Sequence, residues 1–306
     1  NKIKELNPDV ITLDIEMPGM DGITFLKKLM ALRPMPVVMS SSLTQRGADS
    51  TIEALEAGAV DYVPKTTSTD FNSEELSNEL ISKVKNASKV KFRQAKESEI
   101  IKKNPILENA NQFNFKQNIL FAIGSSTGGV EALKDILTNL PKNFPPIVIT
   151  QHMPPKYTQS FAERLNKICQ ISVKEAENGD LIEVGKVYIA PGGMHLEVIK
   201  RGSQLACVVK YGDKVSGHIP SVDVLFDSVA KNIGKVACGV ILTGMGRDGA
   251  KGMLEMKKAG CFNFGQDEDS CVVYGMPKAA YLAGAVDEQV SLSKLPNAMI
   301  NFARVR

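Results

Sequence analysis

Residues 119–137 read ILFAIGSSTGGVEALKDIL, an apolar run followed by a polar turn between glycines and then by a helix-like pattern. Glycines at both ends of the turn permit positive φ and a close approach of the backbone to a ligand. The helix that follows directs its unpaired N–H groups at the turn. Because two serines and a threonine lie there, the turn suits either a bound phosphate or a nucleophilic hydroxyl group.

Apolar runs and helix-like segments alternate on both sides of this turn. Strands are predicted at residues 9–14, 36–41, 60–63, 119–123, 145–150, 170–176, 186–190, 196–199, 205–211 and 236–242. Helices are predicted at residues 23–32, 48–57, 130–137 and 157–169, and from Ser73 and Ser221 onward. The last of the short strands between residues 170 and 211 are expected to pair as hairpins. The other strands alternate with helices, which predicts parallel sheets with ligand sites at the carboxyl ends of the strands.

The composition excludes several classes of protein. At 306 residues with 43% hydrophobic content, the chain has material for about two domains. No run approaches the roughly 20 apolar residues of a membrane span, and the first residues lack the apolar core of a signal peptide, so we expect a cytoplasmic protein without direct membrane insertion. A net charge of +3 without a block of like charges predicts no nucleic-acid partner.

The spacing of cysteines and histidines predicts neither disulfides nor a zinc site. The five cysteines are an odd number with no C-x-x-C pair, which indicates buried thiols. The three histidines, His152, His195 and His218, lack zinc-ligand spacing, so we expect no metal in the C-terminal domain. His195 and His218 either line a cleft with His152 or are ordinary loop residues.

Polar side chains end three predicted strands of the N-terminal part. These are Asp14, Ser41 and Lys65, with Ser40 as the alternative hydroxyl. Alone, Asp14 is more typical of a cap residue that starts a loop. Together, the segments from about residue 10 to residue 65 resemble the receiver domain of two-component response regulators. The resemblance implies that a histidine kinase phosphorylates Asp14 and that Ser41 and Lys65 bind the phosphate, whose added charge biases the surrounding loops.

The resemblance to receivers is incomplete on the N-terminal side. Receivers open with a strand and an acidic pair that holds Mg²⁺, and the sequence from Asn1 supplies neither. We expect the first strand, first helix and second strand to be present in the full protein. Mg²⁺ is expected for receiver phosphorylation only if those acidic residues are present.

Three strand ends of the C-terminal domain carry the side chains of a nucleophilic triad. Ser125 or Ser126 follows the first strand, His152 the second, and Asp248 the long apolar strand. A serine nucleophile needs a histidine to accept its proton and a carboxylate to orient the imidazole. Each residue alone also fits a simpler role. The serines could belong to a phosphate-binding turn, His152 could be an ordinary strand-end residue, and Asp248 could cap the helix after it.

Two functions without catalysis compete with this interpretation. A dinucleotide-binding fold needs a carboxylate roughly 20 residues after the glycine turn to hold the ribose. Gln151 and His152 lie there instead, which favours catalysis over nucleotide binding. The second alternative is a catalytically silent receptor adaptor, which reaction of Ser126 with a serine-directed phosphonate would exclude.

The C-terminal domain closely resembles the catalytic domain of the chemotaxis receptor protein-glutamate methylesterases, the CheB family. The segments that carry the resemblance are residues 123–129, 149–155 and 242–249, with further matches at 221–226 and 273–277. The family usually has alanine where this chain has Ser125, and the Ser-Thr-Gly-Gly register selects Ser126. The resemblance implies these roles: Ser126 as nucleophile, His152 as base, Asp248 as orienting acid, the Met245 N–H as oxyanion donor and Thr127 as a neighbouring hydroxyl.

The resemblance also implies the function. A phosphorylation-regulated serine hydrolase would demethylate glutamate methyl esters, and deamidate glutamines, on bacterial chemoreceptors during chemotactic adaptation. Its partners would be methylated chemoreceptors and the chemotaxis histidine kinase, and its catalysis would need no cofactor. The unphosphorylated receiver would obstruct the catalytic cleft.

The expected architecture is therefore α/β throughout. An N-terminally incomplete (βα)5 receiver is expected over residues 1–97, followed by a linker over residues 98–117 that is rich in charge, Asn and Gln. The methylesterase domain is expected over residues 118–306 as a doubly wound, mostly parallel α/β sheet with a β-hairpin element.

Overall fold

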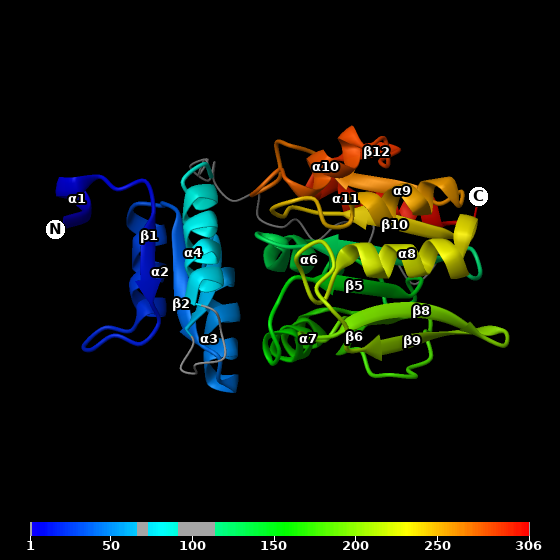
Figure 1. Cartoon of the computed structure of the whole chain (residues 1–306), viewed down its shortest axis with the longest axis horizontal. Helices are drawn as coiled ribbons and strands as arrows, with labels where there is room; N and C mark the ends of the chain where they lie inside the picture. Colours follow the sequence, from blue (N-terminus) through cyan, green and yellow to red (C-terminus); the bar gives the residue numbers. More distant parts are fainter. Residues whose placement is uncertain (1, 66–72, 91–113, 306) are drawn as a thin grey trace. The chain divides into compact units, whose positions relative to one another are not determined.

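The computed structural model describes residues 2–65, 73–90 and 114–305 of the chain. The chain divides between Ile101 and Lys102 into two compact units (Figure 1). Most of the linker expected at residues 98–117 lies outside the described residues, so its limits stay a prediction. Within the described ranges, no helix combines the length and the apolar character that a membrane crossing requires.

The N-terminal unit contains a parallel sheet of three strands in the order β1-β2-β3 (Figure 1). Its strands are β1 (Ile11–Asp14), β2 (Val37–Ser42) and β3 (Asp61–Lys65), and its helices are α1 (Lys2–Leu6), α2 (Gly22–Leu32), α3 (Gln45–Glu56) and α4 (Ser73–Ala87). The side chains of Asp21 and Thr44 begin α2 and α3 by accepting the N–H groups of Thr24 and Gly47. The predicted alternation of strands and helices is confirmed, and α1 is an additional short helix.

The C-terminal unit contains a sheet of seven parallel strands in the order β12-β11-β10-β4-β5-β7-β6. The strands are β4 (Leu120–Ser125), β5 (Ile147–Gln151), β6 (Ser172–Glu175), β7 (Lys186–Ile189), β10 (Ala237–Ile241), β11 (Phe262–Gln266) and β12 (Glu288–Val290). The helices are α6 (Gly129–Leu137), α7 (Tyr157–Ile168), α8 (Val222–Asn232), α9 (Ala250–Lys258), α10 (Met276–Leu282) and α11 (Leu295–Ala303). The predicted α/β fold class is confirmed for both units.

The strand order of the large sheet reverses at β4. The chain continues from β4 to β5 on one side and later returns to β10 on the other side. All residues of β4, β5 and β10 are buried, as expected of central parallel strands. In open parallel sheets, the carboxyl ends of the strands at such a reversal form the ligand site. The strand order therefore predicts that residues following β4, β5 and β10 form one site.

The expected hairpin is confirmed for the last two of the short strands between residues 170 and 211. β8 (His195–Arg201) and β9 (Gln204–Lys210) form an antiparallel hairpin. β6 and β7 are parallel and lie at the edge of the large sheet. The segment between them cannot form a tight turn because it pairs with β9: the Gly179 N–H donates to the Cys207 carbonyl at 2.8 Å and the Ile182 N–H to the Leu205 carbonyl at 2.9 Å.

All five cysteines are free thiols, as predicted from their number and spacing. Cys207, Cys238 and Cys261 are buried, and the other two are partly buried. Burial raises the pKa of every one of these thiols, to about 12 for Cys169 and Cys207. Because the thiolate is the reactive form, these cysteines are poor nucleophiles at neutral pH.

Candidate active site

Ser126 lies directly after β4, in the turn that leads into α6. Its N–H donates to the Thr243 carbonyl at 3.0 Å, which joins the turn to the segment after β10. The glycines at the two ends of the turn are needed for different reasons. Gly128 has a φ of 77°, whereas Gly124 is needed for close packing, since a Cβ there would lie 2.2 Å from Val222 Cγ1. The turn thus holds Ser126 partly exposed, between β4 and the start of α6.

The two adjacent serines have different surroundings. The Ser125 side chain is fully buried, and its hydroxyl donates to Gln151 Oε1 at 2.6 Å. The Gln151 amide in turn donates to the Ser126 carbonyl at 3.1 Å. A buried hydroxyl that is already hydrogen-bonded is poorly placed to attack a substrate. These contacts favour Ser126 over Ser125 as the nucleophile, in agreement with the register of the motif.

His152 and Asp248 lie together, as the strand order predicts. His152 follows β5, and its N–H donates to the Ser125 carbonyl at 3.1 Å. The Nε2 atom of its ring lies 2.8 Å from Asp248 Oδ2. The side chain of His152 is 8% exposed and that of Asp248 is completely buried. The pair is therefore shielded from water, in which a hydrogen bond of this kind would be weaker.

The other partners of Asp248 keep its carboxylate ionised. Asp248 Oδ1 accepts the Ser221 hydroxyl at 2.8 Å and the Asp223 N–H at 3.0 Å, and Oδ2 accepts the Val222 N–H at 2.7 Å. Burial raises the pKa of Asp248, but the hydrogen bonds from His152 and these N–H groups outweigh it, so the pKa lies below its usual value. Asp248 is thus an ionised acceptor, which assigns the ring nitrogen that faces it, His152 Nε2, as the donor of their hydrogen bond.

The second ring nitrogen of His152 is consequently bare. His152 Nδ1 is buried and has no hydrogen-bond partner among the residues that the structure describes. A bare imidazole nitrogen is the acceptor that a general base requires. The Ser126 hydroxyl does not yet fill this position, and such hydrogen bonds often form only when a substrate is bound.

The segment after β10 brings Met245 and Thr127 to the same end of the sheet. The Thr243 hydroxyl donates to the Thr127 carbonyl at 3.0 Å, and the Met276 N–H donates to the Gly244 carbonyl at 2.8 Å. The first bond holds the backbone directly after Ser126, and the second holds the segment after β10, next to Met245. Oxyanion donors need such a fixed backbone because they stabilise charge that appears only during the reaction. The roles assigned to Met245 and Thr127 stay predictions.

The other two histidines have different surroundings in the structure. The His218 ring stacks on the His152 ring, with centroids 3.8 Å apart and an angle of 12° between the planes. His195 is buried and its ring is engaged by backbone: its Nε2 donates to the Asp213 carbonyl at 2.9 Å, and its Nδ1 accepts the Ser221 N–H at 3.2 Å. His218 therefore belongs to the candidate site, whereas His195 holds loop backbone.

Sequence reasoning missed the partners that hold Asp248. Ser221 is the N-cap residue of α8, as a serine before a helix suggests, but its side chain makes no capping bond to the helix. Asp248 caps α8 instead, by accepting the N–H groups of Val222 and Asp223. The simpler alternative for Asp248, a cap of the helix after it, does not hold, since Gly249 is the N-cap of α9. No local pattern connects residues 221 and 248, because their contact depends on long-range packing.

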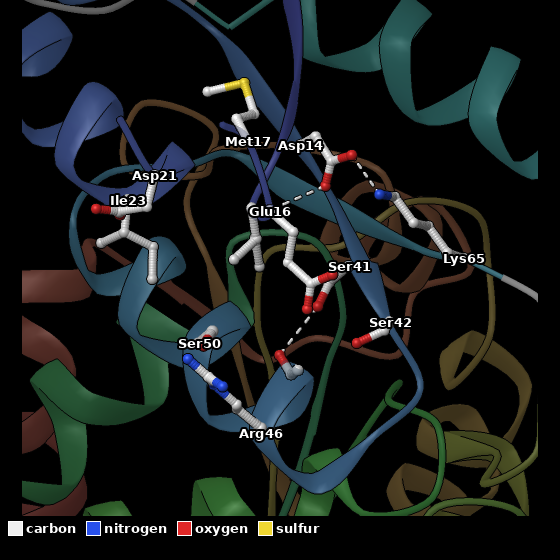
Figure 2. A pocket seen from close by; sticks show the side chains of 12 residues that line it. Asp14, Glu16, Met17, Asp21, Ile23, Ser41, Ser42, Arg46, Ser50 and Lys65 are labelled. Carbon is white, nitrogen blue, oxygen red and sulfur yellow. Dashed lines mark hydrogen bonds and ion pairs between the residues drawn. The ribbon is translucent and has the colours of Figure 1, made fainter. Parts of the chain in front are cut away.

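In the N-terminal unit, three of the predicted residues line one pocket. Asp14 ends β1 and is ion-paired through Oδ2 with Lys65 Nζ from β3, while its Oδ1 accepts the Glu16 N–H at 3.1 Å (Figure 2). The pocket has a volume of about 320 Å³, and Ser41 also contributes to its wall. Ser41 is 2% exposed, and its hydroxyl donates to the Gly47 carbonyl at 3.0 Å. The structure thus brings Asp14, Ser41 and Lys65 together.

The alternative hydroxyl, Ser40, is not part of this pocket wall, whereas Ser41 and Ser42 are. The described residues do not fit a complete metal site. No group of three or more His, Cys, Asp or Glu side chains within them could hold a metal ion, and the Asp14 carboxylate is ion-paired with Lys65.

Replacing Lys65 by methionine is expected to raise the pKa of Asp14 toward its usual value. Partial burial raises this pKa, but the Lys65 ammonium and the Glu16 N–H outweigh it, so the pKa lies below the usual range. A carboxyl ¹³C titration by NMR measures the change. Lys27→Met is the control, because Lys27 pairs with Glu53 instead. An unchanged Asp14 titration in Lys65→Met would contradict the importance of the ion pair.

The fold and the two sites define a class of protein. A receiver-like unit with an Asp–Lys pair is followed by a parallel α/β unit with a His–Asp pair beside a serine turn. This combination is typical of a response regulator with a serine hydrolase as its output domain.

Comparisons with known proteins place the chain within this class. A family model described as CheB methylesterase matches residues 121–299, and one described as response regulator receiver domain matches residues 1–78. A protein-glutamate methylesterase/protein-glutamine glutaminase 1 of Caulobacter vibrioides is 53% identical over 309 residues, covering 99% of this chain and 87% of the relative. A protein-glutamate methylesterase/protein-glutamine glutaminase of Salmonella typhi is 50% identical over 302 residues, covering 97% of this chain and 84% of the relative.

The solved structures agree with these relatives. The crystal structure of the Thermotoga maritima CheB methylesterase catalytic domain matches with a TM-score of 0.60 and 41% identity, covering 61% of this chain and all of that one. The chain therefore belongs to the CheB methylesterase family.

Proposed function

We propose that this protein hydrolyses glutamate γ-methyl esters on methylated chemoreceptors, with Ser126 as nucleophile, His152 as base and Asp248 as orienting acid. The observation that carries the proposal is the buried hydrogen bond of 2.8 Å between His152 Nε2 and Asp248 Oδ2, which leaves Nδ1 bare. The relatives from Caulobacter vibrioides and Salmonella typhi carry the name of this activity. Their identity over nearly the whole chain supports the same substrate class here.

The proposed reaction has two halves. Ser126 Oγ attacks the ester carbonyl carbon while His152 Nδ1 accepts the hydroxyl proton, and the imidazolium then donates that proton to the departing methoxide oxygen. Methanol leaves and an acyl-serine remains. Water then attacks the acyl-serine, His152 accepts one proton of the water and returns it to Ser126 Oγ, and a glutamate side chain is released. The Asp248 carboxylate stabilises the imidazolium in both halves.

Backbone N–H groups are proposed to stabilise the negative charge of the tetrahedral intermediate. The Met245 N–H is the assigned donor, with the Thr127 hydroxyl beside it, and α6 directs the positive end of its dipole toward the turn. A glutamine amide undergoes the same acyl chemistry with ammonia as the leaving group. The proposed activity therefore includes deamidation, and it assigns no step to a cofactor.

Methanol release from methylated receptor, followed over time with the intact protein, tests the proposal. We expect release that depends on protein concentration and stops after treatment with a serine-directed phosphonate. The modified residue, identified by peptide mass spectrometry, should be Ser126. Absence of methanol release under all conditions would contradict the proposal.

The receiver is proposed to control this activity from the cytoplasm. A chemotaxis histidine kinase is the proposed phosphodonor, Asp14 the acceptor, and Lys65 and Ser41 the groups that bind the phosphate. Mg²⁺ is proposed for this step only together with the acidic pair that receivers carry on their first strand. Phosphorylation is proposed to raise the rate of ester hydrolysis.

Asp14→Asn is expected to abolish the rise in methanol release that a phosphodonor causes in the intact protein. An amide cannot form the acyl phosphate, so the charge that biases the receiver loops is never added. The control is Asp9→Asn, which removes an exposed carboxylate just before β1 and should leave activation intact. Normal activation of Asp14→Asn would contradict the assignment of the phosphorylation site.

A further inference from the structure

The His218 ring covers one face of the His152 ring. The centroids are 3.8 Å apart and the planes are nearly parallel, at 12°. His152 also has one edge contact, the hydrogen bond from Nε2 to Asp248. A single hydrogen bond leaves a ring free to tilt around the donor–acceptor direction, whereas a flat partner on the face restricts that tilt. The two contacts together define the ring plane, and so the direction in which Nδ1 points.

We propose that His218 is a positioning residue that keeps the His152 ring oriented with Nε2 on Asp248 and Nδ1 available as the base. This inference rests on the proposed ester hydrolysis. His218 is not assigned a proton transfer: the group that it acts through is His152. The property that matters is its flat ring, placed in van der Waals contact with the imidazole.

The loop that carries His218 is held at both ends by His195. The Asp213 carbonyl accepts from His195 Nε2 at 2.9 Å, and the Ser221 N–H donates to His195 Nδ1 at 3.2 Å. Between these points, the Ser216 hydroxyl donates to Asp223 Oδ2 at 2.7 Å. One buried ring thus bridges the start and the end of the loop, which explains how a loop residue can be placed accurately over His152.

The backbone of His218 itself is also fixed. Val215 and His218 exchange two hydrogen bonds of 3.0 Å, each N–H donating to the carbonyl of the other residue. Ser221, at the end of the loop, donates its hydroxyl to Asp248. The stacking ring and the orienting carboxylate therefore belong to one connected set of hydrogen bonds, and displacement of the loop would move both.

The test compares four variants of the intact protein by methanol release and by ¹⁵N NMR of the histidine rings. His218→Phe keeps a flat ring, His218→Leu fills the space without one, and His218→Ala removes the side chain. Val215→Ala is the matched control, since its loop bonds are made by the backbone. Leucine retains most of the volume, so it keeps the test decisive if the alanine variant does not fold.

The leucine and alanine variants are expected to lower kcat by roughly 10- to 100-fold, the usual cost of a misplaced catalytic group, with KM changed by less than about 3-fold. Phenylalanine should restore kcat to within about 5-fold of wild type, and Val215→Ala should remain within about 2-fold. The ¹⁵N shifts of His152 should show the Nε2–H tautomer in wild type, His218→Phe and Val215→Ala, and a mixture of tautomers in His218→Leu and His218→Ala.

Two results would overturn the proposal. One is a wild-type kcat and tautomer in His218→Leu, and the other is a His218→Phe variant as slow as His218→Leu. If the wild-type protein releases no methanol, the proposed hydrolysis fails, but the ¹⁵N shifts still decide whether His218 orients the ring. The two failures are therefore distinguishable.

Discussion

Ser126→Ala is expected to lower kcat for methanol release by about 10⁴-fold or more. Without the hydroxyl no acyl-serine can form, and the remaining rate comes only from substrate binding and the oxyanion donors. The substitution removes a single partly exposed oxygen, so the free energy of unfolding should change by less than about 1 kcal/mol. Initial rates with methylated receptor, together with a urea unfolding curve, measure both quantities.

Ser125→Ala is the matched control, one residue away and chemically identical. It removes the hydrogen bond to Gln151 and leaves a buried carbonyl oxygen without that donor. We expect a loss of stability of about 1–3 kcal/mol, with kcat within about 10-fold of wild type. The pattern of effects is thus opposite for the two serines. Full activity of Ser126→Ala with loss of activity in Ser125→Ala would show that the nucleophile is wrongly assigned.

Asp248→Asn is expected to lower kcat by about 10⁴-fold, because the amide favours the wrong tautomer of His152 and cannot stabilise the imidazolium. It should also destabilise the fold by about 3 kcal/mol, since the buried carboxylate accepts from the Ser221 hydroxyl and from two N–H groups of α8. An amide places its own N–H₂ against one of these donors. Initial rates and urea unfolding at pH 7 test the two effects.

The loss of unfolding free energy in Asp248→Asn is expected to depend on pH. The pKa of Asp248 is lower in the folded chain than its ordinary value, because its hydrogen bonds outweigh the effect of burial. Such a group stabilises the fold above its unfolded pKa, and that contribution is lost as the pH falls through the folded value. The difference in unfolding free energy between wild type and Asp248→Asn should therefore be full at pH 7 and shrink below about pH 4.

Asp227→Asn is the control for this substitution. It makes the same change further along α8, where the carboxylate is partly buried and burial raises its pKa. Removing that charge should leave kcat within about 2-fold and should not destabilise the fold. Equal kcat losses in Asp227→Asn and Asp248→Asn would contradict a specific role for Asp248.

Much of the fold could be predicted because its central strands are continuous apolar runs. Residues such as 237–241 have no polar face, and this identifies a strand buried on both sides. Polar residues directly after such runs then mark strand ends. In this way His152 and Asp248 could be assigned to one site before their hydrogen bond was known, although they are 96 residues apart.

Other features depend on packing that no local pattern records. The parallel pairing of β6 with β7 follows from the pairing of the intervening segment with β9. The contact of Ser221 with Asp248 needs α8 to lie against β4, which Gly124 permits. The sequence does not distinguish His195 from His218, whereas the fold does: His195 begins β8 and anchors backbone, and His218 lies after β9 and stacks on the base.

The position of β10 next to β4 has a consequence for synthesis of the protein on the ribosome. β5 pairs with β4 from a neighbouring part of the chain, but β10 joins β4 only after the hairpin and α8 have been made. A nascent chain that ends before β10 holds the serine and the histidine but not the acid. Because contacts between distant segments form late, the complete set of catalytic residues should assemble only near the end of folding.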